Sequence, residues 1–198
     1  MTSSLELFDQ LGVLPKFLAQ GQRSDAIRIL RANDQKPLLT FDFAPLANRT
    51  TTPFVLALSQ DRTERILLDA VRETGMVKVV FGDAFHSFEP NQASVLVSSA
   101  SGHRFQSSFL VGADGAHSTV RAQLGWQLEG KTYPTRAALA DVRVAPEADI
   151  AGAWLANPDA DSFTIAIRFG EGIWRIIEAA IPDDVTDDQL PARAKAQA

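Results

Sequence analysis

The 198-residue sequence contains no cysteine, and its charged residues form no basic run. Without cysteine the chain can form neither a disulfide framework nor a thiolate metal site, and it has no redox-active thiol. Its 19 Lys and Arg residues stand against 24 Asp and Glu residues, for a formal net charge of -5. This balance argues against a nucleic-acid backbone or an anionic membrane surface as a partner, and favours a small molecule or a protein.

The N-terminal end also lacks a basic segment followed by a long apolar stretch, so the sequence predicts a cytoplasmic protein without a secretory signal. With 45% hydrophobic and 22% charged residues, the chain has the composition of a globular protein. Its three histidines, His86, His103 and His117, have no metal-ligand spacing. We therefore predict no metal site.

Three pairs of residues have the spacing of a helix capping box, with Ser, Thr or Asp three positions before Glu or Gln. These pairs are Ser3 with Glu6, Asp61 with Glu64, and Thr186 with Gln189. Gly12 and Gly75 are the expected ends of the first two helices. The third helix would begin so near the last residue that the C-terminus looks cut. The acidic residues 183–188 precede it, which favours helix-dipole complementarity over a cation site.

Short β-favouring runs separated by turn residues fill most of the remaining sequence. The runs are 27–30, 38–41, 54–58, 77–81, 84–88, 93–97, 105–111, 137–144, 151–155, 163–169 and 173–181. The four runs between residues 77 and 111 predict a β-meander that leads into a buried strand. We expect 13–58 and 137–181 to form one mostly antiparallel sheet, with a hairpin turn at 170–172. The aromatic residues Trp154, Phe163, Phe169 and Trp174 fit either plain sheet packing or the lining of an aromatic pocket.

The most informative stretch is 109–121, FLVGADGAHSTVR, in which an apolar run ends in a glycine-rich turn and a helix pattern follows. Glycine permits a positive φ or a close approach of the backbone to a ligand, and α/β folds bind ligands where strands end. The Asp114 carboxylate is suited to accept hydrogen bonds from ribose hydroxyls, and Arg121 to pair with a carboxylate or a phosphate. The alternative is an ordinary junction in which Asp114 or Ser118 caps the helix.

This stretch resembles the second flavin motif of the FAD-dependent aromatic-ring monooxygenases of the p-hydroxybenzoate hydroxylase and phenol hydroxylase type. The matching residues are Gly112, Asp114, Gly115, Ser118 and Arg121. The resemblance implies that Asp114 lies near the FAD ribose, in a stretch that the family also associates with the NAD(P)H pyrophosphate. Residues 58–67 are similar to the family's segment in which a Gln opens a helix beside the flavin ribityl chain, which points to Gln60. The alternative for Gln60 is an ordinary surface residue before a helix.

Residues 4–12 resemble the helix that follows the family's flavin-contacting Arg, which would stand at about the start of this chain. The family's Gly-x-Gly-x-x-Gly turn, which seats the FAD pyrophosphate, would lie before residue 1, and its Gly-Asp motif after residue 198. We therefore expect an internal fragment that purifies without bound FAD. We also expect its open edges, at strand 105–111 or helix 61–74, to be covered in a homo-oligomer or by a rearranged terminus.

The implied fold is α/β (α+β). It combines a partial FAD-binding Rossmann-like layer, at 1–26 and 59–125, with a mostly antiparallel substrate-domain sheet, at 27–58 and 126–198. The implied enzyme uses NAD(P)H, FAD and O2 to hydroxylate a small aromatic substrate. We assign no catalytic acid or base, because the cofactor carries the chemistry. The alternative is a non-catalytic remnant that binds a small ligand or a partner protein.

Overall fold

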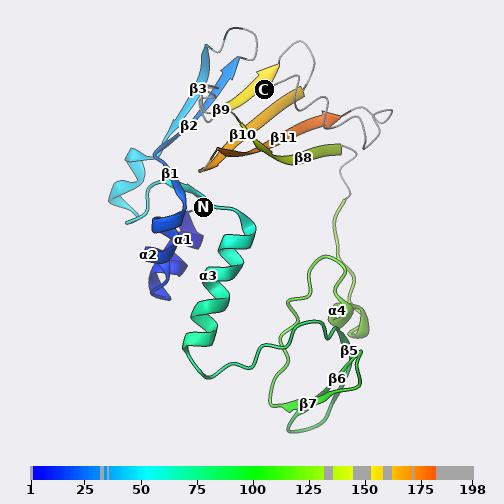
Figure 1. The fold of residues 1–198 in the computed structure, drawn as a ribbon. Helices are drawn as coiled ribbons and strands as arrows, with labels where there is room; N and C mark the ends of the chain where they lie inside the picture. Colours follow the sequence, from blue (N-terminus) through cyan, green and yellow to red (C-terminus); the bar gives the residue numbers. More distant parts are fainter. Residues whose placement is uncertain are drawn as a thin grey trace. The chain divides into compact units, whose positions relative to one another are not determined.

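The structure is a computed structural model that describes residues 2–31, 34, 36–131, 136–144, 153–157, 162–170 and 172–181. The chain divides into two compact units, one made of Met1–Gly75 and Pro134–Ala198 and the other of Met76–Tyr133 (Figure 1). The predicted C-terminal helix and the acidic residues 183–188 lie outside the described residues. The predicted division into FAD-binding and substrate-domain portions stays a prediction.

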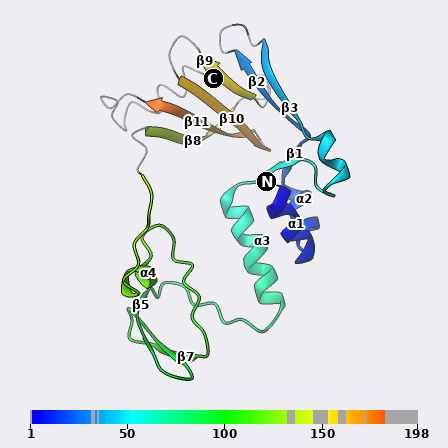
Figure 2. The same cartoon turned by 180° about the vertical axis from the view of Figure 1, so that it is seen from behind.

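A six-stranded sheet forms most of the first unit, and its order is β3-β2-β9-β10-β11-β8. Its strands are β2 (Ala26–Arg31), β3 (Pro37–Asp42), β8 (Arg136–Arg143), β9 (Ala153–Asn157), β10 (Ser162–Gly170) and β11 (Ile173–Ile181). Every neighbouring pair is antiparallel except β2 with β9, which are parallel. Figure 2 shows the blue strands β2 and β3 continuing the sheet beside β9. The prediction that the two stretches share one mostly antiparallel sheet is therefore confirmed for these strands, and it is wrong for the run 54–58, which belongs to a separate two-stranded sheet.

The pleat of the sheet buries one face of β10 and β11. Ala166, Trp174 and Ile176 form a buried cluster, with Val142 and Val144 packed against it. The hairpin turn between these strands is confirmed by Gly170 and Gly172, which have φ values of 93° and 72°. Because most side chains avoid this left-handed region, glycine allows the chain to reverse here.

The described part of the first unit also contains three α-helices and a small two-stranded sheet. The helices are α1 (Thr2–Gln10), α2 (Leu14–Gln20) and α3 (Gln60–Glu73), and β1 (Gln22–Ser24) pairs with β4 (Val55–Ala57). A short 3-10 helix spans Ala44–Asn48. The helices pack through Phe17, which stacks on Phe8 with ring centroids 4.2 Å apart and lies in a cluster with Ile66 of α3.

Two predicted capping boxes are wrong in position. α1 already begins at Thr2, so Ser3 lies inside the helix. α3 begins at Gln60 with Ser59 as its N-cap, and Asp61 lies in the first turn. The Ser59 hydroxyl bonds to the Asp61 carboxylate, so these two side chains pair with each other. The predicted helix ends are confirmed, since Gly12 and Gly75 both have positive φ values.

The second unit contains a three-stranded antiparallel meander of β5 (Phe85–Pro90), β6 (Val95–Ser99) and β7 (Arg104–Ser107). The helix α4 (Thr119–Gln123) is tied to β5 by Gln123, whose side chain donates to the His86 carbonyl at 2.6 Å and accepts from the Phe88 N–H at 3.2 Å. The meander confirms three of the four predicted strands.

The predicted strand at 77–81 and the predicted buried strand ending at Val111 are wrong. Residues 77–81 have no ladder partner among the described residues, and β7 ends at Ser107. Phe109 and Val111 are 85% and 84% exposed. A strand requires a neighbour that takes its backbone hydrogen bonds, and the described part of this unit provides none at these segments. No helix in the described ranges is long and apolar enough to cross a membrane.

Candidate functional site

The turn before α4 is ordered by the Asp114 side chain. One oxygen of its carboxylate, Oδ1, accepts a hydrogen bond from the Ser118 hydroxyl, and Oδ2 accepts one from the Val120 N–H at 3.1 Å. The Ser118 oxygen in turn accepts the Arg121 N–H at 3.0 Å, which makes Ser118 the N-cap of α4. The side chains of Asp114 and Ser118 thus cap the helix together, as the alternative reading of this turn expects.

Two glycines give the turn its shape. Gly115 has a φ of 79°, in the left-handed region that favours glycine. At Gly112 a Cβ atom would lie only 2.9 Å from Cγ1 of Val120, so the absence of a side chain lets the chain pass close to α4. The motif predicts the positive φ of Gly115, whereas the close approach at Gly112 is to Val120 of α4 and not to the ligand that the motif predicts.

The Arg121 guanidinium folds back on the turn rather than pairing with a carboxylate among the described contacts. Its Nη1 donates to the Gly115 carbonyl at 3.4 Å, and its Nη2 donates to the Ala116 carbonyl. Five of the six predicted cofactor-binding residues are therefore brought together in one turn. They are Gly112, Asp114, Gly115, Ser118 and Arg121.

The turn has the donor and acceptor capacity that a ribose requires. The Ser118 hydroxyl, followed by the Val120 N–H, holds the pKa of the Asp114 carboxyl below its usual value, so the group is ionised at neutral pH. An ionised carboxylate offers about four acceptor positions, and the turn uses two of them. Asp114 is exposed. The residues present therefore fit a ligand that offers hydroxyl donors.

Gln60, the sixth predicted residue, belongs to the first unit. It is the first residue of α3, is exposed, and donates from Nε2 to the Glu64 carboxylate at 2.8 Å. This contact is the ordinary pairing of residues four apart on a helix surface. A role for Gln60 beside a flavin stays a prediction.

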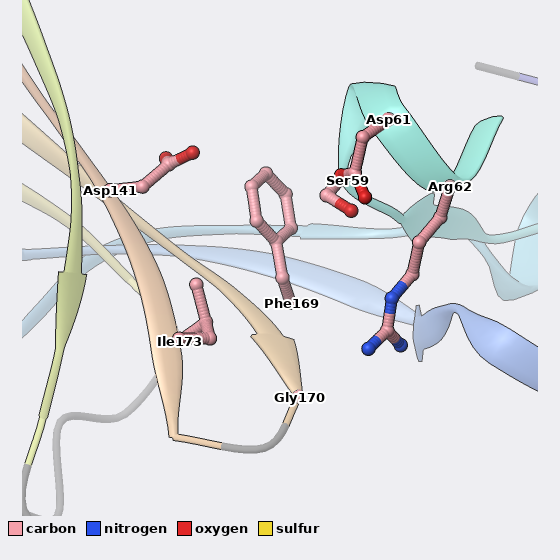
Figure 3. Close-up of a pocket in the computed structure, with 7 residues that line it drawn as sticks. All are labelled: Ser59, Asp61, Arg62, Asp141, Phe169, Gly170 and Ile173. Carbon is pink, nitrogen blue, oxygen red and sulfur yellow. The ribbon is translucent and has the colours of Figure 1, made fainter. Parts of the chain in front are cut away.

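A pocket near Gln60 was not predicted from the sequence. It has a volume of about 220 Å³ and lies between the start of α3 and the ends of β8, β10 and β11 (Figure 3). Its lining residues are Ser59, Asp61, Arg62, Asp141, Phe169, Gly170 and Ile173. The sequence did indicate Phe169 as a candidate for an aromatic pocket, whereas Trp174, indicated with it, is buried in the sheet core. The side chains of Trp154 and Phe163 lie outside the described part of the structure.

An ion pair orders one wall of this pocket. Arg175 lies directly opposite Asp141 in the pairing of β11 with β8. Its Nε and Nη2 donate to the two carboxylate oxygens of Asp141 at 2.8 and 3.0 Å. The guanidinium carbon lies 4.9 Å from the centre of the Phe169 ring. A two-point ion pair and a cation-π contact together fix the plane of the guanidinium.

The two carboxylates of the pocket are both ionised at neutral pH. The hydrogen bonds from Arg175 hold the pKa of Asp141 below its usual value, although the nearby Asp61 charge works in the opposite direction. The Ser59 hydroxyl lowers the pKa of Asp61. Arg175 balances the charge of Asp141, and Arg62 lines the pocket together with Asp61, so the pocket presents both signs of charge beside Phe169 and Ile173.

The chain matches the family model described as FAD binding domain over residues 1–197. It belongs to this family. An uncharacterized aromatic compound monooxygenase of Bacillus subtilis (strain 168) is 30% identical over 142 residues, which are 70% of this chain and 27% of that protein. The para-nitrophenol 4-monooxygenase of Pseudomonas sp. (strain WBC-3) is 25% identical over 78% of this chain and 40% of its own length.

Solved structures agree on the fold. The p-nitrophenol 4-monooxygenase of Pseudomonas putida DLL-E4 superposes with a TM-score of 0.85 over 100% of this chain and 50% of that chain, at 18% identity. This confirms the predicted α/β class of fold. The chain spans half or less of these relatives, and FAD is the cofactor of the family.

Proposed function

We propose that this chain is part of an FAD-dependent monooxygenase that hydroxylates a small aromatic substrate. The reaction converts an aromatic C–H, O2, NAD(P)H and a proton into a phenolic C–OH, water and NAD(P)+. FAD, when bound, supplies the transfer of electrons from the nicotinamide to oxygen. NAD(P)H as the reductant and a cytoplasmic location are parts of the same proposal.

The observation that carries this proposal is the ordered turn at Asp114. Its carboxylate is exposed, ionised and preoriented by Ser118 and the Val120 N–H. A preoriented acceptor loses little conformational entropy when a ribose hydroxyl donates to it. A Cβ on Gly115 would meet no atom within 4 Å, so a ligand has room to approach the backbone there, and Gln60 is the proposed contact to the flavin ribityl chain.

Titration of the purified chain with FAD tests this proposal. We expect quenching of flavin fluorescence that saturates, and weaker binding by about tenfold in Asp114→Asn, because the neutral amide is a poorer acceptor. Asp9→Asn, which removes the same charge from an exposed residue of α1, is the matched control and should bind as the unchanged chain does.

A second measurement follows the reaction. With FAD bound, a phenol should stimulate NAD(P)H oxidation, and 18O from 18O2 should appear in the hydroxylated product. A chain that takes up no added FAD at any concentration would contradict the proposal and favour the non-catalytic remnant. The expectation that the chain purifies without FAD is separate, and stoichiometric flavin released on denaturation would contradict it.

A further inference from the structure

The outer edge of β3 is open at one end of the large sheet. β3 is the terminal strand in the sheet order, so no strand of the described chain pairs with its outer side (Figure 1). Leu39 and Phe41 of this strand are 47% and 48% exposed. Natural proteins protect such edges with charge, proline or a bulge, because unpaired backbone groups can receive a second strand.

The hydrogen bonds between β2 and β3 show which backbone groups face outward. The Phe43 N–H donates to the Asp25 carbonyl at 3.1 Å, in register with the pairing of the two strands. Hydrogen-bonded and non-hydrogen-bonded pairs alternate along antiparallel strands. Phe41 therefore turns its N–H and C=O towards β2, whereas Thr40 and Asp42 turn theirs to the open edge.

Both ends of this edge are closed to a partner strand. Pro37 has no N–H, and Leu38 is an extra residue that shifts the register of β3 with β2. After Phe43 the chain enters the 3-10 helix at 44–48. The part of the edge that can receive a strand is therefore 39–43, with Phe41 at its centre.

A second copy of residues 39–43 complements the first when the two pair antiparallel about Phe41. Thr40 then lies opposite Asp42 of the second copy, and each such pair exchanges both of its N–H···O bonds. Side chains alternate along a strand, so Leu39, Phe41 and Phe43 share one face and form an apolar row with their counterparts.

Charge also favours this arrangement. Arg28 of β2 is exposed and lies directly opposite Thr40. In the paired copies, one row across the strands consists of Arg28, Thr40 and then Asp42 of the second copy. The outer two Cα atoms of this row would be about 10 Å apart, a span that extended Arg and Asp side chains cover together. Two-fold symmetry produces the row twice.

We propose that two copies of this chain associate through β3, with residues 39–43 paired antiparallel about Phe41, so that two six-stranded sheets join along their edges. The pairing involves few residues, so the association is weak and depends on concentration. It uses residues of the first unit and needs neither FAD nor the proposed function.

The chain contains no cysteine, so a single introduced thiol reports the register of the pairing. The two copies of residue 41 would form a non-hydrogen-bonded pair with Cα atoms about 4.5 Å apart, which is within the range of a disulfide. Under mild oxidation we expect Phe41→Cys to form a disulfide-linked dimer about tenfold faster than Leu39→Cys.

Leu39→Cys is the matched control for this measurement. Leu39 lies on the same face of the same strand as Phe41 and is equally exposed. Its two copies would be four positions apart along the paired strands, or roughly 13 Å, which is too far for a disulfide.

A second variant tests the backbone hydrogen bonds. Thr40→Pro removes an N–H that faces outward and leaves the hydrogen bonds between β2 and β3 in place. Combined with Phe41→Cys it should slow the formation of the dimer by about tenfold, because each copy loses one bond. Thr40→Val keeps the N–H and should leave the rate unchanged. Backbone amide signals of residues 26–31 verify that the sheet is retained.

Two outcomes would overturn the proposal. One is equal formation of dimer by Phe41→Cys and Leu39→Cys, including none by either. The other is a rate that Thr40→Pro leaves unchanged while the amide signals of 26–31 persist. Association through another surface would not favour position 41 over position 39, so the comparison identifies the β3 edge specifically.

Discussion

The backbone of Gly112 lies so close to the Val120 side chain that no side chain fits at position 112 without displacement. A Cβ on Gly112 would lie 2.9 Å from Cγ1 and 3.0 Å from Cβ of Val120. We expect Gly112→Ala to lower the free energy of unfolding by about 1–3 kcal/mol, through overpacking against α4. Urea denaturation followed by the backbone amide signals of residues 119–123 in NMR spectra would measure this.

The double variant with Val120→Ala separates crowding from other causes. If the methyl groups of Val120 are the obstacle, the two substitutions together should cost less than the sum of their separate effects. Additive losses would contradict the steric explanation.

Asp83 is a second residue whose environment leads to a measurable effect. Its side chain is 7% exposed, and Oδ2 lies 2.8 Å from the Nδ1 of His103. The hydrogen bond with His103, followed by that with Ser101, holds the pKa of Asp83 far below its ordinary value of 3.8. A carboxyl whose pKa is lower in the folded state stabilises that state at any pH above its ordinary pKa. This stabilisation is lost as the pH falls through the folded-state pKa.

We therefore expect His103→Ala to raise the pKa of Asp83 towards 3.8 and to move acid unfolding to a higher pH. NMR titration of the Asp83 carboxyl carbon between pH 1 and pH 6 would measure the change, over a range chosen to bracket an ordinary Asp at about 4. His86→Ala, at an exposed position of β5, is the control. An unchanged Asp83 titration in His103→Ala would show that Ser101 and its neighbours carry the shift.

For single residues, contacts between residues close together in the sequence could be predicted, and contacts between residues on paired strands could not. The motif at 112–121 identified a turn whose hydrogen bonds span at most six positions, such as that of Asp114 with Val120. The Asp141–Arg175 pair joins residues 34 positions apart, and it depends on the register of β8 with β11. A shift of one residue would place the two side chains on opposite faces of the sheet, and sequence alone does not set that register.

Among the helices, α4 depends on its cap to an unusual degree because it has only five residues. Isolated helices of this length are unstable in water. We expect Ser118→Ala to cost about 1 kcal/mol, since it removes the acceptor of the Arg121 N–H. Amide hydrogen exchange at residues 121–124 would report the loss as faster exchange.

Ser118→Thr provides the control, because it keeps a hydroxyl at the same place. It should recover most of the protection of the helix. Equal exchange in the Ala and Thr variants would show that the Asp114 contact to Val120 is sufficient to hold the helix.

The elements predicted well are those with neighbours in the described chain. β2, β3, β8, β10 and β11 match predicted runs to within a residue or two, because their alternating pattern meets a partner strand. The run at 77–81 is also rich in β-favouring residues, but it forms no strand. β-propensity reports fitness for a sheet surface, and a sheet also needs a second strand to receive the hydrogen bonds.

For the whole molecule, exposed apolar side chains in the second unit lead to a prediction about association. The most exposed of them are Met76, Phe81, Phe109, Val111, Trp126 and Leu128, each at least 67% exposed. Soluble monomers rarely expose so many large apolar groups in one small region. We expect the chain to self-associate, with light scattering over a dilution series giving a mass that rises with concentration.

Phe109→Ser with Val111→Ser should shift this equilibrium towards the monomer, because it removes two of these side chains. Leu7→Ser, at a position of α1 that is 51% exposed, is the matched control in the first unit. A monomer at every concentration would contradict the prediction.

The parallel pairing of β2 with β9 has a consequence for the order in which the protein is made. Arg28 lies beside Ala153, so all of Met76–Tyr133 is synthesised between the two strands. At roughly 5–20 residues per second, a ribosome needs on the order of ten seconds for that distance. During this interval the β2–β3 hairpin waits with one edge open while the second unit is already free to fold. The second unit can therefore fold before the first unit is complete, and throughout this interval the free edge of the hairpin is a place where another strand could pair.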